Sequence, residues 1–138
     1  MSTPASPIPR KFYRVAYQRL EEAEVLLDRG YFTGAVYLAG YAVECMLKAL
    51  ILNSLPAKDH DSVEAEFRGQ RAHQYEWLRL RYAQTNAPGL PAEIGRSLAF
   101  VSTWETSLRY TPGLGDRQDA LRFLAEAGRI LDWADKRL

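Results

Sequence analysis

One stretch of the chain, residues 31–53, constrains the fold more than any other. Its residues, YFTGAVYLAGYAVECMLKALILN, are apolar almost all the way round a helix, and such a helix needs partners on most of its sides. The stretch also contains two charges, Glu44 and Lys48, which lie four residues apart and therefore share a helical face. Because an unpaired charge is costly to bury, we expect the central helix of a bundle with one polar notch, whose charges are paired, exposed at a groove, or used.

The length and composition indicate one folded domain over residues 1–138. The chain is 47% hydrophobic and 25% charged, which is typical of a globular protein with a single core. The net charge is +1, so any attraction to nucleic acid must come from local clustering of basic residues. Residues 1–8 are rich in proline and serine, and we expect them to be frayed.

Several features favour a cytoplasmic protein. The one cysteine, Cys45, leaves no possible disulfide framework within the chain, and we expect it to be a small buried hydrophobic residue. The N-terminus lacks the apolar core of a signal peptide. Residues 31–53 are long enough to cross a membrane. Their two charges and the amphipathic segments around them favour a soluble bundle instead, with no membrane partner.

Apolar residues at helical spacing predict the helices, and no strand pattern competes. The five predicted helices are separated by Gly30, by the segment that begins at Pro56, by Pro88-Gly89 and by the Pro- and Gly-containing residues 110–115. They span about Pro9 to Asp28, the residues after Gly30 to near Leu55, His73 to the residues before Pro88, Pro91 to Leu108, and Asp116 to Arg137. We therefore expect an all-α fold, an antiparallel up-and-down bundle of four to five helices.

The segment from Pro56 to Ala72 is long for a connection in a compact bundle, so it is either mobile or functional. Asp61 followed by Glu64 predicts a capping box and a short helix through Phe67. The run of residues 58–61, KDHD, is expected to be a solvated loop, because one histidine between two aspartates is weak evidence for metal. We expect no metal and no cofactor, since the chain also lacks a phosphate-binding glycine loop and a nucleophile elbow.

Two segments combine arginine with aromatic residues. Residues 68–82, RGQRAHQYEWLRLRY, contain four arginines, His73 and three aromatics, a combination that can contact phosphates and stack on unpaired bases. The alternative is a helix whose aromatics face the core and whose arginines face water, with His73 capping that helix or packing on its neighbour. Arg109 and Tyr110 lie where the fourth predicted helix gives way to the Pro- and Gly-containing residues 110–115. Arg109 there either complements a helix C-terminus or projects into a groove.

In their order and spacing these segments resemble the HEPN domains, small all-α proteins common in prokaryotes and often encoded beside a minimal nucleotidyltransferase. The resemblance runs almost end to end. It rests on the helix from Tyr13 to Leu27, on Glu44, Leu47, Lys48 and Ala49 in the second helix, on His73 in AHQYEWL, on LRY at 108–110 and on the closing ALRFLAEAGRILDWADKRL. It implies a bundle that is usually dimeric, with a ligand-binding groove lined by Glu44, Lys48, His73, Arg109 and Tyr110.

Many HEPN relatives are metal-independent ribonucleases that act as toxins or defence effectors. Their active site is an arginine followed, after roughly four to six residues, by a histidine near the start of the last core helix, and it uses an acid or base beside the 2′-hydroxyl. Arg109 lies where that arginine is expected, but no histidine follows it. Arg68 and His73 have the required spacing but lie at the start of the third predicted helix, which is the wrong part of the fold for this motif.

We therefore expect a non-catalytic HEPN-like binding module in a toxin–antitoxin or defence context. It would form a homodimer, pair with a nucleotidyltransferase, or bind nucleotide or RNA with Lys48 and Arg109 on phosphate. The alternative is a ribonuclease toxin that uses Arg68 and His73, or Arg109 and His73 brought together by folding. A purely structural bundle is the third reading. Candidates for the dimer face are the small-residue side of the second helix and the aromatics around Trp77.

Overall fold

The computed structural model describes residues 3–103 and 116–138, and these form helices without any strand. The predicted all-α bundle is confirmed. The described α-helices are α1 (Pro7–Asp28), α2 (Phe32–Asn53), α3 (His60–Glu66), α4 (Tyr75–Ala83), α5 (Ala92–Ser102) and α6 (Arg117–Asp135), with two short 3₁₀ helices, η1 (Ala57–Asp59) and η2 (Gln70–His73).

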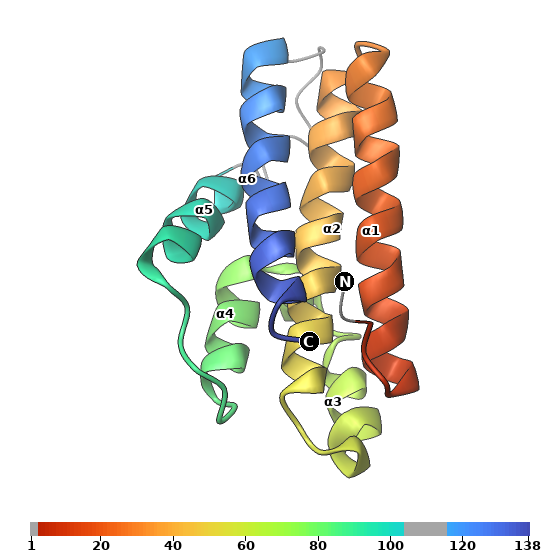
Figure 1. Ribbon diagram of the computed structural model, residues 1–138, viewed down its shortest axis with the longest axis vertical. Coiled ribbons are helices and arrows are strands. Elements are labelled where there is room, and N and C mark those ends of the chain that lie inside the picture. Colours follow the sequence, from red (N-terminus) through yellow and green to blue (C-terminus); the bar gives the residue numbers. More distant parts are fainter. Residues whose placement is uncertain (1–2, 104–115) are drawn as a thin grey trace.

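Three long helices, α1, α2 and α6, lie side by side and form the body of the bundle (Figure 1). α1 runs upward in this view, whereas α2 and α6 run downward. Gly30 closes the turn between α1 and α2 with φ of 83°, a backbone conformation that favours glycine. α5 packs on α6, α4 packs on α2, and α3 lies near the end of the bundle where α1 begins.

α2 is the central helix, as its sequence predicts. Every residue from Ala42 to Leu52 is buried, including both charges. α2 is long and apolar enough to cross a membrane, yet most of it is buried inside the protein. Packing against α1, α4 and α6 therefore accounts for its apolar character, because each of these helices removes one of its faces from water.

The small residues of α2 are also buried within the chain. Ala35, Ala39 and Ala42 have no exposed surface, so the expectation that this side forms a dimer face is wrong. Small side chains let the neighbouring helices of the same bundle approach instead. Cys45 is buried as expected, and burial raises the pKa of its thiol to about 11, which keeps it protonated and unreactive at neutral pH.

The ends of several elements differ from the prediction. α1 begins at Pro7 and Pro4 is buried, so the expectation of a frayed segment over residues 1–8 is wrong for this part. Proline suits the first turn of a helix because its missing N–H needs no partner there. Asp116 caps α6 as predicted, and its carboxylate accepts a hydrogen bond from the backbone N–H of Gln118 at 2.7 Å.

The connection between α2 and α4 is more regular than its sequence indicates. The predicted short helix is confirmed as α3, but the capping box is wrong. Asp59 precedes the helix without a side-chain cap, and Asp61 lies in its first turn, because η1 leads directly into α3. The run KDHD is not a solvated loop: His60 is buried, and its Nε2 lies 3.0 Å from the carbonyl oxygen of Leu55.

A carboxylate held by two tyrosines ties α1 to α6. The hydroxyl groups of Tyr13 and Tyr17 donate hydrogen bonds to the two oxygens of Asp135, at 3.1 and 3.0 Å. Burial raises the pKa of both tyrosines, and the adjacent Asp135 carboxylate raises it further. The neutral phenols are thus stabilised as donors at the point where the first and last helices meet.

We expect the Asp135→Ala substitution to lower the free energy of unfolding by about 2 kcal/mol, because two hydrogen bonds to a charged acceptor are lost. Urea denaturation measures this value. Asp132→Ala is the matched control, since Asp132 is exposed on the same helix, and it should have little effect.

The same contact predicts a pH dependence. Because the tyrosine pKa values are higher in the folded state, the stabilisation is complete below the unfolded value of about 10 and is lost as the pH rises through the folded values. Asp135→Ala should make this alkaline loss shallower. Equal effects of the two aspartate substitutions would contradict the assignment.

Candidate functional site

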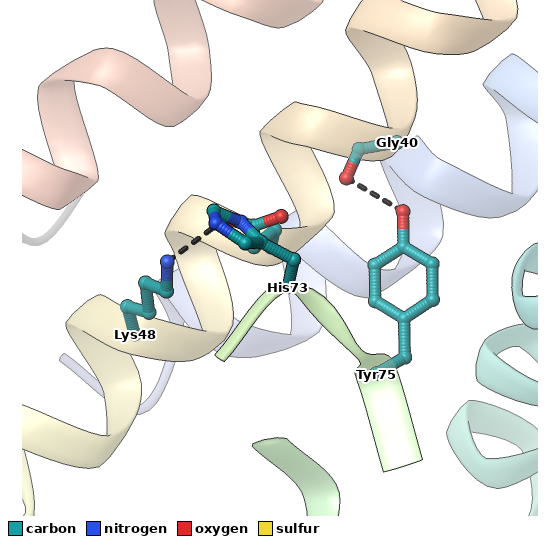
Figure 2. Close-up of polar contacts among 5 residues, drawn as sticks. Gly40, Lys48, His73 and Tyr75 are labelled. Atoms are coloured by element: carbon teal, nitrogen blue, oxygen red, sulfur yellow. Dashed lines mark hydrogen bonds and ion pairs between the residues drawn. The ribbon is translucent and has the colours of Figure 1, made fainter. Parts of the chain in front are cut away.

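Glu44, Lys48 and His73 meet at one point on α2. Lys48 Nζ donates a hydrogen bond to Glu44 Oε2 at 2.8 Å, and His73 Nδ1 lies 3.0 Å from the same oxygen. Figure 2 shows Lys48 rising from α2 and His73 lying over the helix from the neighbouring segment. One carboxylate oxygen thus joins an ion pair within α2 to a histidine that is 29 residues further along the chain.

The backbone around His73 explains how the imidazole reaches α2. His73 is the last residue of η2, not the first of α4 as predicted, and Gln74 is extended before α4 begins at Tyr75. The hydroxyl of Tyr75 donates a hydrogen bond to the carbonyl oxygen of Gly40 at 2.8 Å (Figure 2). Side chains on both sides of Gln74 are therefore anchored to α2.

Gly40 is required by this anchor. A Cβ atom at position 40 would lie 2.7 Å from the hydroxyl oxygen of Tyr75, closer than real Cβ atoms approach other atoms. The missing side chain therefore allows the tyrosine to reach the helix backbone. One small residue on α2 thus helps to hold His73 in place, one turn away from Glu44.

Aromatic rings enclose the Lys48 ammonium group. Its Nζ lies 5.9 Å from the ring centre of Phe12 on α1 and 5.5 Å from that of Phe67, just after α3. The two rings meet edge to face at 5.8 Å. Cation–π attraction of this kind partly offsets the loss of water around the ammonium group. The pair of charges is consequently held by residues from three separate segments.

Only part of this cluster is open to solvent. The side chains of Lys48 and Glu44 are 6% and 10% exposed, whereas that of His73 is 44% exposed. Of the three alternatives for the polar notch, the structure shows the pairing of Glu44 with Lys48. The burial of Lys48 does not fit the expected contact with phosphate, because its ammonium group faces the carboxylate and two rings. Lys48 instead holds Glu44, and Glu44 holds His73.

The contacts define how the imidazole is oriented. An ionised carboxylate only accepts hydrogen bonds, and Lys48 already donates to it. Nδ1 of His73 therefore carries the hydrogen in this contact, and Nε2 is the ring nitrogen left for a ligand. A carboxylate that fixes an imidazole in this way prepares Nε2 to donate to a phosphate when charged, or to accept a proton when neutral.

The arginine-rich segment divides into two groups. Arg79 pairs with Glu76 and Arg81 pairs with Glu66, so these two guanidinium groups have protein partners. Arg68 and Arg71 are exposed and have no side-chain partner among the described residues. Arg68 makes no hydrogen bond with His73 in this part of the chain. The predicted pair is therefore not joined by a hydrogen bond or ion pair among the described residues.

The aromatic residues of the same segment follow the structural alternative. Tyr75 and Tyr82 are buried, and Trp77 is half-buried, with its ring 6.3 Å from that of Phe67. They serve the core, so stacking on unpaired bases is not favoured for them. Arg109 and Tyr110, the other residues expected at the groove, lie outside the described residues.

Sequence reasoning missed the role of Phe12 and Phe67. Phe12 belongs to the apolar stripe of the first helix, and Phe67 ends the short helix, so each has an ordinary reason to be apolar. No local pattern indicates that they share one cation. That relation depends on how α1 and α3 pack against α2.

We expect Lys48→Ala to lower the free energy of unfolding by about 3 kcal/mol, because it leaves a buried carboxylate with His73 as its remaining partner. Chemical denaturation measures the effect. Replacing both charges, with Glu44→Gln and Lys48→Met, should cost less than Lys48→Ala alone. Lys11→Ala is the control, since its ion pair with Glu64 is at the surface and is worth less than about 1 kcal/mol. Equal losses for the two lysines would contradict the structural role.

Comparison with known proteins identifies the fold. Residues 9–137 match the HEPN domain. A search of curated proteins and a search of solved structures returned no match. The match covers nearly the whole chain and agrees with the family that the sequence resembles. The chain therefore belongs to the HEPN domain family.

Proposed function

We propose that this HEPN protein is a non-catalytic binding module that recognises the phosphate groups of nucleotide or RNA. The observation that carries the proposal is the exposed imidazole of His73, held through Nδ1 by a buried carboxylate. The contact gives the buried carboxylate a second partner and also fixes the orientation of the partly exposed ring. Its fixed orientation reduces the entropy lost when Nε2 engages a ligand.

The residues around His73 supply the charge. Arg68 and Arg71 precede it on the same segment and are exposed, and arginine binds phosphate through two parallel hydrogen bonds. The net charge of the whole chain is only +1, so attraction to an anionic polymer has to come from a cluster of this kind. We define the phosphate-binding edge as Arg68, Arg71 and His73.

The wider proposal is a homodimer in the cytoplasm that pairs with a nucleotidyltransferase in a toxin–antitoxin or defence context. Membership of the HEPN family and the buried free thiol of Cys45 support this setting. A second copy would present two phosphate-binding edges to one RNA, which raises the apparent affinity without any new contact. Arg109 and Tyr110 stay candidates for the same surface.

We expect the double substitution Arg68→Gln and Arg71→Gln to weaken binding of a fluorescently labelled single-stranded RNA about tenfold or more, because two charge-assisted contacts are lost. His73→Ala should weaken it as well. Fluorescence anisotropy at two salt concentrations measures the affinity, and the dependence on salt should become shallower in the double variant.

Arg29→Gln provides the matched control for this experiment. It removes the same charge from an exposed residue that directly follows the C-terminal end of α1, whereas α3 and the start of α1 lie at the opposite end of the bundle (Figure 1). Its affinity should stay close to that of the unaltered protein. Unchanged affinity in the double variant, or an equal loss in the control, would rule out the edge as the binding surface.

A metal-independent ribonuclease is the second candidate, and the Glu44–His73 hydrogen bond favours it. In this reading Nε2 of His73 takes the proton of a 2′-hydroxyl group, while an arginine stabilises the charge on the phosphate. The 2′-oxygen would then attack the adjacent phosphorus, the bond to the 5′-oxygen would break, and that oxygen would take a proton from the charged imidazole or from water. The fragments would end in a cyclic phosphate and a 5′-hydroxyl group.

Incubation of purified protein with RNA and a chelator separates the two candidates. For the binding module we expect no cleavage that depends on His73. A ribonuclease would lose roughly a hundredfold or more of its rate in His73→Ala, while Arg29→Gln would retain it. Cleavage with that dependence would replace our first proposal by the second.

A further inference from the structure

A second candidate site lies on another part of the bundle, between α5 and α6. A cavity of about 300 Å³ opens there, and its lining includes Arg96, Ser97, Phe100, Arg122 and Arg129. A volume of this size is at the lower end of the range for small-molecule sites. The cavity shares no lining residue with the Lys48–Glu44–His73 cluster.

Ser97 supplies an unpartnered polar group to this cavity. The residue is 2% exposed, yet its hydroxyl group has no hydrogen-bond partner among the described residues. Ser102, one turn and a residue further along α5, instead donates to the carbonyl oxygen of Leu98 at 2.8 Å. Ser97 lines the cavity, so its hydroxyl group is available to a bound molecule.

Three guanidinium groups surround the same space. Arg122 lies over the ring of Phe100, 4.2 Å from its centre, and this stacking leaves the N–H edge of the guanidinium free. Arg96 has no side-chain partner among the described residues. Arg129 is 3.7 Å from the carboxylate of Glu126, which is longer than a hydrogen bond. All three groups can therefore turn their donors towards an anion.

Two carboxylates limit the charge that the cavity accepts. Glu93 and Glu126 belong to the lining, so three arginines and two glutamates leave a formal charge of +1. A site with this balance suits one phosphate group better than a polyphosphate. The carboxylates can also accept hydrogen bonds from hydroxyl groups beside that phosphate.

We infer that the α5–α6 cleft binds a small phosphate monoester. The phosphate would accept hydrogen bonds from the Ser97 hydroxyl and from the guanidinium groups of Arg96 and Arg122. The organic part would lie towards Glu93 or Glu126. This site is independent of the phosphate-binding edge around His73, because it uses other helices and other residues.

Isothermal titration calorimetry of the full chain tests the inference with ribose 5-phosphate, inorganic phosphate and ribose as probes. Ribose 5-phosphate should bind, inorganic phosphate should bind more weakly, and ribose should give no heat of binding. The double substitution Arg96→Gln and Arg122→Gln should weaken the binding of ribose 5-phosphate about tenfold or more. Glu93→Gln should tighten it, because a like charge is removed.

Two further variants separate a real site from general attraction to a basic protein. Arg14→Gln removes the same charge from an exposed position on α1 and should not change the affinity. His73→Ala should not change it either, which distinguishes this cleft from the proposed RNA-binding edge. Absence of heat with both phosphate probes at millimolar concentration, or an equal loss in Arg14→Gln, would overturn the inference.

Ser97→Ala tests the hydroxyl group directly. If the hydroxyl serves a ligand, the substitution should weaken the binding of ribose 5-phosphate severalfold without lowering the melting temperature, because no internal hydrogen bond is lost. Ser102→Ala, which removes an internal hydrogen bond, should leave binding unchanged. A destabilised Ser97→Ala variant with full affinity would assign the hydroxyl a structural role and exclude it from the site.

Discussion

The structure depends on how two opposite charges are accommodated in the middle of its most buried helix. Removing Glu44 and Lys48 from water is unfavourable unless their remaining hydrogen-bonding and electrostatic needs are met. The ion pair within α2 meets part of this need. Phe12, Phe67 and His73 meet the rest, and they come from α1, from the end of α3 and from η2. The position of the long connection is therefore coupled to the charges of the central helix.

This coupling gives the connection between α2 and α4 its functional interest. Its length alone indicates either mobility or function. In the structure it is a regular segment that is anchored to α2 by the side chains of His73 and Tyr75. The His73 ring stays partly exposed, and the Glu44 carboxylate holds it through Nδ1. Such an arrangement resembles the way in which carboxylates orient histidines in catalytic and binding sites. The same geometry therefore supports either recognition of phosphate or proton transfer.

Two positively charged places follow from the fold, and they differ in construction. The edge formed by Arg68, Arg71 and His73 is open and suits a long anionic chain. The α5–α6 cleft has an enclosed hydroxyl group and opposing carboxylates, which suit a small molecule with one phosphate. A protein with a net charge of +1 can therefore still offer local attraction, because some of its acidic residues, such as Glu76 and Glu66, are paired with other arginines.

The sequence alone determined the all-α fold, the central place of residues 31–53 and the pairing of Glu44 with Lys48. Periodicity and the cost of buried charge are local rules, and they apply wherever the helix packs. The resemblance already placed His73 beside that pair, but the oxygen that the His73 and Lys48 side chains share, the two rings around Lys48 and the inward position of its ammonium group were decided by the tertiary structure. These features depend on how α1, α3 and η2 pack against α2. Local sequence patterns do not predict which residues far apart in the chain come into contact. For this reason the polar notch could be predicted, whereas its exposed member, His73 rather than Lys48, could not.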